Sequence, residues 1–113
     1  MLLDATTATI GRYMDLLSAR QKLVASNLAN ADTPGYKTQD IDFQFEFISL
    51  AQGQGPQIIQ PADLPEKPDG NNVSVDREAR LLAENAIRFN LASTLAKGVF
   101  KTIRSAIEEG KSS

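Results

Sequence analysis

The sequence contains no cysteine, no histidine and no tryptophan. Without cysteine there are no disulfides, no thiolate nucleophiles and few ways to build a zinc site. Without histidine the chain lacks the side chain best suited to general acid–base catalysis near neutral pH. Catalysis would have to rest on carboxylates, lysine, hydroxyls or tyrosine alone, so we expect no enzymatic activity, no cofactor and no metal site.

Strong charge of one sign and long apolar runs are also absent. The 12 basic and 14 acidic residues leave a formal net charge of −2, without the basic block that neutralises nucleic-acid phosphates. No apolar run approaches the roughly 18 residues of a membrane-spanning helix, and the N-terminus has no signal-peptide pattern. We therefore expect no nucleic-acid partner, no small-molecule substrate, no direct membrane span and no cleavable signal peptide.

The 113 residues are enough for one domain. The pattern predicts an N-terminal helix over 4–31, a turn and short element over 32–50, a flexible Pro/Gly-rich linker over 51–74, and a C-terminal helix over 75–109. The fold class is all-α: two long terminal helices packed as an antiparallel, coiled-coil-like hairpin, joined by a short helix or extended segment and the linker.

Both predicted helices carry apolar side chains at alternating steps of four and three, which is the spacing of a coiled-coil seam. The C-terminal seam is longer, and Leu91, Leu95 and Val99 widen it beyond a two-stranded contact. Ser74 or Asp76 can cap this helix and Gly110 can end it. The seam residues expected to pack between subunits are Ile10, Met14, Leu17, Val24, Leu28, Leu82, Phe89, Phe100, Ile103 and Ile107.

The longer helix has more apolar surface than the shorter one can cover. Ordering some 34 residues costs about 1–2 kcal/mol each in backbone entropy, and burial of the seam returns about 1–3 kcal/mol per large side chain. The uncovered face therefore indicates packing against other subunits. A hairpin that dimerises into a four-helix bundle is an alternative consistent with the same periodicity.

The segment 41–50 fits two structures. Its alternation of apolar and polar residues is typical of a strand, whereas the spacing of Phe43, Phe47 and Leu50 suits a short helix. Carboxylates recur in pairs or triplets along the chain, and we interpret them as solvent-exposed charge. They are Asp40/Asp42, Asp63/Glu66/Asp69, Asp76/Glu78 and Glu108/Glu109.

Eleven consecutive residues, Asn27-Leu28-Ala29-Asn30-Ala31-Asp32-Thr33-Pro34-Gly35-Tyr36-Lys37, mark the end of the first helix. Pro34-Gly35 is typical of a type II turn, the two asparagines can bond free carbonyls or a neighbouring backbone, and Tyr36 can bury its ring with its hydroxyl bonded. This segment resembles the signature of the flagellar axial proteins, the rod and hook group. Asp69-Gly70-Asn71-Asn72-Val73, with Asp76, Glu78 and Asn85 after it, resembles the proximal rod subunits of that group, the FlgB type.

Other rod proteins and the hook protein share the first motif, but the short middle region favours a proximal rod subunit. The resemblance implies a structural subunit that self-assembles with copies and related rod proteins into a helical tube transmitting torque. It also implies neighbours in the membrane ring and near the export gate, type III export and a periplasmic location in the basal body. In this reading Asn27, Asn30, Thr33, Pro34, Gly35 and Tyr36 form an assembly motif. The rival hypothesis is a cytoplasmic helical-hairpin adaptor that dimerises through its seams.

Overall fold

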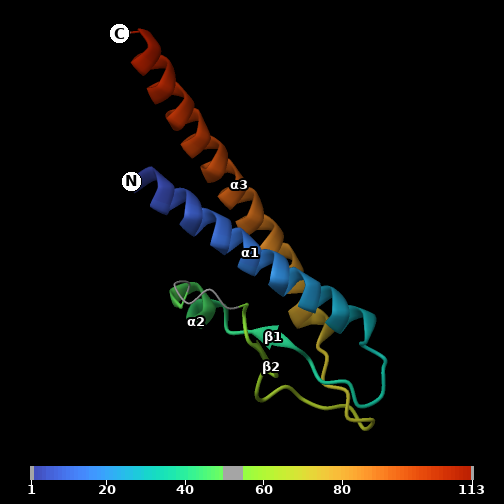
Figure 1. Cartoon of the computed structure of the whole chain (residues 1–113). Coiled ribbons are helices and arrows are strands. Elements are labelled where there is room, and N and C mark those ends of the chain that lie inside the picture. The colour runs from blue at the N-terminus through green and yellow to red at the C-terminus, as the bar shows by residue number, and fades with distance from the viewer. Residues whose placement is uncertain (1, 50–54, 113) are drawn as a thin grey trace.

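The computed structural model describes residues 2–49 and 55–112. Within these residues, three helices and two short strands follow one another, arranged as Figure 1 shows. They are α1 (Leu2–Ala29), β1 (Asp40–Ile41), α2 (Phe43–Ile48), β2 (Ile58–Ile59) and α3 (Val75–Ser112).

The two long helices run antiparallel and form a hairpin, as predicted. We call the end at which α1 finishes and α3 begins the closed end, and the end that holds both termini the open end, where the two helices diverge (Figure 1). The molecule measures 72 × 26 × 17 Å and its radius of gyration is 18.7 Å, against roughly 13 Å for a compact chain of this length. The elongated shape leaves most residues of α3 exposed.

The boundaries of α3 follow one sequence prediction and depart from another. The Oγ atom of Ser74 accepts a hydrogen bond from the backbone N–H of Arg77 at 3.2 Å, so Ser74 is the N-cap. Gly110 does not end the helix, which continues to Ser112; that prediction was wrong. A glycine inside a helix costs only about 1 kcal/mol relative to alanine, and Gly110 keeps a negative φ, unlike Gly35 and Gly70.

The middle of the chain packs along one side of the hairpin near the closed end (Figure 1). Of the two structures considered for 41–50, the helix is formed over Phe43–Ile48, while Ile41 belongs to β1. α2 begins after Asp42, whose side chain accepts from the N–H of Phe45 at 3.1 Å. Tyr13 of α1 contacts the rings of Phe43 and Phe47 edge-on, with centroids 5.5 Å away in each case. These ring contacts hold α2 against α1.

The expected linker contains a strand. β2 pairs antiparallel with β1, Asp40 opposite Ile59 and Ile41 opposite Ile58. Residues 50–54, which join α2 to this strand and include part of the expected linker, lie outside the described residues.

The core is thin and unusually polar. Among the described residues, the buried apolar side chains are Leu16, Leu17, Val24, Ile41, Val73 and Ala92. The buried polar ones are more numerous: Asn27, Thr38, Asp40, Asn71, Asn72, Glu78 and Asn85. Hydrophobic burial is therefore modest, and directional hydrogen bonds determine how the segments fit together.

Candidate assembly site

The turn after α1 has the geometry that its sequence predicts. The N–H of Tyr36 donates to the carbonyl of Thr33 at 3.2 Å, and Gly35 between them has a φ of 76°. This is the positive φ that the third residue of a type II turn requires. The Nδ2 of Asn30 donates to the carbonyl of Ser26 at 2.9 Å, satisfying a free acceptor in the last turn of α1.

Asn27 joins α1 to the chain that leaves the turn. Its amide is buried; Nδ2 donates to the carbonyl of Gln39 at 2.8 Å, and Oδ1 accepts from the N–H of Gln39 at 3.0 Å. The hydroxyl of Tyr36 donates to the same Oδ1 at 3.0 Å and lies 3.3 Å from the hydroxyl of Ser26. The Asn27 amide thus bonds both the N–H and the carbonyl of Gln39, as a neighbouring strand would. These bonds hold residues 36–39 along α1.

Asn71 joins the second motif to the first. Its Nδ2 donates to the carbonyl of Asn30 at 2.9 Å and to that of Thr33 at 2.8 Å. Its Oδ1 accepts from the N–H of Val73 at 2.9 Å. The side chain is fully buried, and both of its amide hydrogens are used. A residue 41 positions away in sequence thus caps the end of α1.

The neighbouring residue, Asn72, makes a different kind of contact. Its Oδ1 accepts from the N–H of Thr38 at 2.6 Å, and its carbonyl accepts from the hydroxyl of Thr38 at 3.2 Å. We call the four buried residues Asn27, Thr38, Asn71 and Asn72, with the hydrogen bonds given above, the polar lock. The lock ties the end of α1 to the segment that begins α3.

A buried ion cluster lies beside the lock. Asp40 accepts from Nε and Nη2 of Arg20 at 3.0 and 3.1 Å, and from Nη2 of Arg77 at 2.6 Å. Arg77 also bonds Glu78 Oε1 at 2.7 Å. The cluster connects α1, β1 and α3. The interpretation of every acidic pair as solvent-exposed charge was wrong for Asp40 and Glu78, because both side chains are buried.

Sequence reasoning missed this cluster because its members are far apart in the chain. Arg20 and Asp40 lie 20 positions apart, and Asp40 and Arg77 lie 37 apart. One local signal was available: Asp40 comes directly before the segment of alternating apolar residues, one face of which had to be buried. An acidic residue at that place could have indicated a buried carboxylate. Glu78 Oε2 is buried and has no hydrogen-bond partner within residues 2–49 and 55–112.

The apolar seam of α1 and that of α3 are placed differently. In α1, Leu17 and Val24 are buried inside the subunit, while Ile10, Met14 and Leu28 are half-buried. In α3, Leu82, Phe89, Phe100 and Ile107 are 38–57% exposed and Ile103 is half-buried. Most of the predicted C-terminal seam is therefore exposed at the surface of the subunit.

A different row of α3 faces α1. Glu78, Asn85 and Ala92, each seven residues after the last, are buried, and the Nδ2 of Asn85 donates to Oε1 of Gln21 at 2.9 Å. Because Asn85 and Glu78 are polar, an apolar pattern could not identify this row. The exposed residues of the predicted seam, Leu82, Phe89, Phe100 and Ile107, are called the α3 stripe below.

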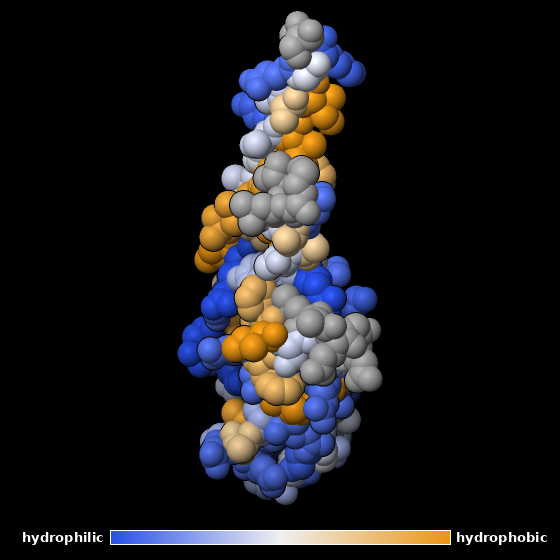
Figure 2. Space-filling model, turned by 60° about the vertical axis from the view of Figure 1, so that its left-hand side comes forward, coloured by the Kyte–Doolittle hydropathy of each residue, from blue (hydrophilic) through white to orange (hydrophobic). Residues whose placement is uncertain are grey.

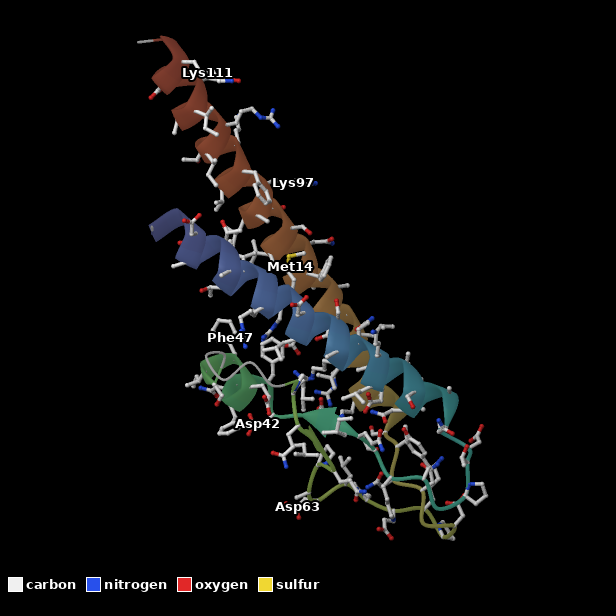
Figure 3. The ribbon with its side chains drawn as sticks, viewed as in Figure 1. Met14, Asp42, Phe47, Asp63, Lys97 and Lys111 are labelled. Carbon is white, nitrogen blue, oxygen red and sulfur yellow. The ribbon has the colours of Figure 1, made fainter. Side chains whose placement is uncertain are left out.

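Grooves run along both sides of the hairpin. On the stripe side, one groove contains Leu17, Ala86 and Phe89, and a second, nearer the open end, contains Ile10, Met14 and Phe100. Figure 3 shows Met14 of α1 between the two long helices and Phe47 of α2 directed towards α1. Phe47 lines the groove on the other side, of about 290 Å³, whose apolar wall includes Leu91 and Leu95.

Apolar surface is correspondingly visible on the outside of the molecule. Figure 2 shows hydrophobic patches along the long helices towards the open end, separated by polar surface. Exposed apolar surface gathered in this way marks interaction sites on proteins. In the part of the chain that the structure describes, no helix is long and apolar enough to span a membrane, and no acidic group of three or more could hold a metal ion.

Comparison with known proteins gives consistent results. The family model described as "Flagella basal body rod protein" matches residues 14–37, the second half of α1 and the turn. The chain is similar to the flagellar basal body rod protein FlgB of Yersinia enterocolitica, with 32% identity over 86% of this chain and 89% of that protein. It is also similar to FlgB of Escherichia coli K12, at 29% identity over 96% of each chain, and of Bacillus subtilis 168, at 24% over 97% and 98%.

Proposed function

The chain belongs to the FlgB family of flagellar basal-body rod proteins, and from this premise we infer how its hairpin serves the rod. It is a structural subunit of the flagellar basal body, which decides between the rod and the hairpin-adaptor hypotheses. We propose that the subunit belongs to the proximal rod, that its work is structural and not catalytic, and that it lies in the periplasmic part of the basal body.

In the proposed assembly, copies of the subunit and related rod proteins pack side by side through the long helices to form the wall of a tube that transmits torque. One observation carries this proposal: the four side chains of the α3 stripe recur at steps of 7, 11 and 7 residues along α3 and are 38–57% exposed. In a monomer, the exposed apolar row contributes no burial that would offset the entropy lost in ordering the 38-residue α3. Neighbouring subunits supply the missing contact.

The polar lock supports the same proposal from the closed end. It holds α1 and α3 in one relative position through hydrogen bonds that need no apolar core. The apolar side chains are thereby left for contacts outside the subunit. The assembly motif predicted from sequence, 27–37, acts in this proposal mainly inside the subunit, where it shapes the surface offered to neighbours.

The test is a charge placed on the stripe. Phe100→Asp should abolish rod assembly, because burying an unpaired carboxylate in an apolar contact costs several kcal/mol. Thr102→Asp is the matched control: it adds the same charge two residues away on an exposed position, where Oγ1 donates only to the carbonyl of Gly98. Swimming motility and the subunit content of purified basal bodies give the readout. Normal rods from the Phe100 variant would rule out the stripe as a subunit contact.

A further inference from the structure

The middle of the α1–α3 contact does little to define how far one helix slides along the other. Ala79, Ala86 and Ser93 occupy equivalent places one heptad apart on α3 and are all small. A slide of one heptad, about 10 Å, would exchange these small side chains for one another, while in the buried row Ala92 would take the place of Asn85. Along this stretch it would break one side-chain hydrogen bond between the helices, that from Asn85 to Gln21.

The closed end is far more selective. The same slide would carry the start of α3 and the preceding residues away from α1. It would break both bonds from Asn71 to the carbonyls of Asn30 and Thr33. It would also separate Arg77 from Asp40. Asn71 itself is fully buried, so a slide that removed both carbonyls would leave its amide hydrogens without these acceptors.

We propose that Asn71 is the positioning residue that sets the register of α3 along α1. Because α3 is one continuous helix from Val75 to Ser112, placing its first turn also places Phe100 and Ile107 near its far end. The register set at the closed end therefore decides the position along the helix axis at which the α3 stripe contacts a neighbouring subunit. This role rests on the proposed function of the stripe, but it concerns a contact within one chain.

The absence of cysteine makes the register directly measurable by disulfide trapping in the full-length protein. Ser18 and Ala86 line the same groove, so the pair Ser18→Cys with Ala86→Cys reports the native register. Ser18→Cys with Ala79→Cys, or with Ser93→Cys, reports a slide of one heptad in either direction. All four positions carry small side chains. A disulfide needs Cα atoms within about 7 Å, which a 10 Å slide removes.

In the unaltered background we expect the native pair to form at least tenfold more disulfide than either shifted pair in a glutathione buffer. Asn71→Asp replaces two N–H donors by a carboxylate facing two carbonyls, and should lower that ratio at least fivefold. Asn72→Asp is the matched control, since the group it alters accepts from Thr38, and a carboxylate can still accept. Replacing both Gln21 and Asn85 by leucine should also leave the ratio unchanged.

Several outcomes would overturn the proposal. An unchanged ratio in Asn71→Asp with helical circular dichroism retained would do so, and so would a collapse of the ratio in the Gln21/Asn85 double variant. If Asn71→Asp loses its helices, the test is repeated with Asn71→Ala, which removes the donors without adding charge. If Asn71→Ala also loses its helices, Asn71 is needed for stability and the proposal is wrong. If Asn71→Asp keeps the native register while Phe100→Asp still fails to assemble, this inference is wrong and the proposed function of the stripe stands.

Discussion

Replacing Asp40 by asparagine isolates the contribution of the buried ion cluster to stability. The carboxylate accepts from Arg20 twice, from Arg77 at 2.6 Å and from the N–H of Ile41 at 2.7 Å. Its side chain is 5% exposed, while those of Arg20 and Arg77 are 17% and 21% exposed. Asparagine keeps the size of the group, removes its charge and turns one acceptor into a donor that faces guanidinium.

Removing one partner of a buried ion pair costs about 3–5 kcal/mol. The lower end applies here, because both guanidiniums reach some solvent and Arg77 keeps its bond to Glu78. We therefore expect Asp40→Asn to lower the free energy of unfolding by about 3 kcal/mol. For a urea dependence of about 1–3 kcal/mol per molar, the unfolding midpoint falls by about 1–3 M. Circular dichroism at 222 nm follows the transition.

Asp76→Asn serves as the control, because it removes a carboxylate of the same type from an exposed pair. Asp76 and Arg80 are 90% and 75% exposed and lie 3.7 Å apart, so the urea midpoint should not change measurably. The difference between the two variants should persist at high salt, since buried pairs are screened less than exposed ones. Equal midpoints for Asp40→Asn and Asp76→Asn would refute a stabilising role for the buried cluster.

Three further results are expected. Tyr36→Phe removes the hydroxyl that donates to Asn27 and should cost about 1 kcal/mol in urea unfolding; no loss would show that water satisfies Asn27 equally well. Gly70→Ala should cost about 1–2 kcal/mol because φ is +88° there. Gly55→Ala, where an added Cβ meets nothing within 4 Å, should be neutral; equal effects would contradict the requirement for glycine at position 70. Helical circular dichroism should change little when subunits assemble, because α1 and α3 are already complete in the single chain; a large rise on assembly would contradict the described helix ends.

The sequence predicted the elements of this fold better than their contacts. The two long helices follow from the four–three spacing of apolar residues, and the turn follows from Pro34-Gly35, because both signals are local. The choice of helix over strand for 43–48 was not local: it depends on Tyr13, which packs against Phe43 and Phe47 from another element.

Which row of α3 faces α1 could not be predicted from hydrophobicity. Apolar side chains occur on more than one face of α3, and the row that is buried holds Glu78 and Asn85. Burial of these polar groups depends on Arg77 and Gln21, which bond them. The same holds for the polar lock: its donors and acceptors are 12 to 41 positions apart, and nothing in either segment alone shows that they meet.

The central claim is that the α3 stripe is a contact between rod subunits, and site-specific photo-crosslinking in cells tests it most directly. A benzophenone amino acid at Phe100 should yield a covalent adduct with another rod subunit in purified basal bodies. The same probe at Thr102 should yield far less, because that position is exposed on the other side of α3. Equal adducts from the two positions, or none from Phe100 in fully assembled rods, would contradict the account.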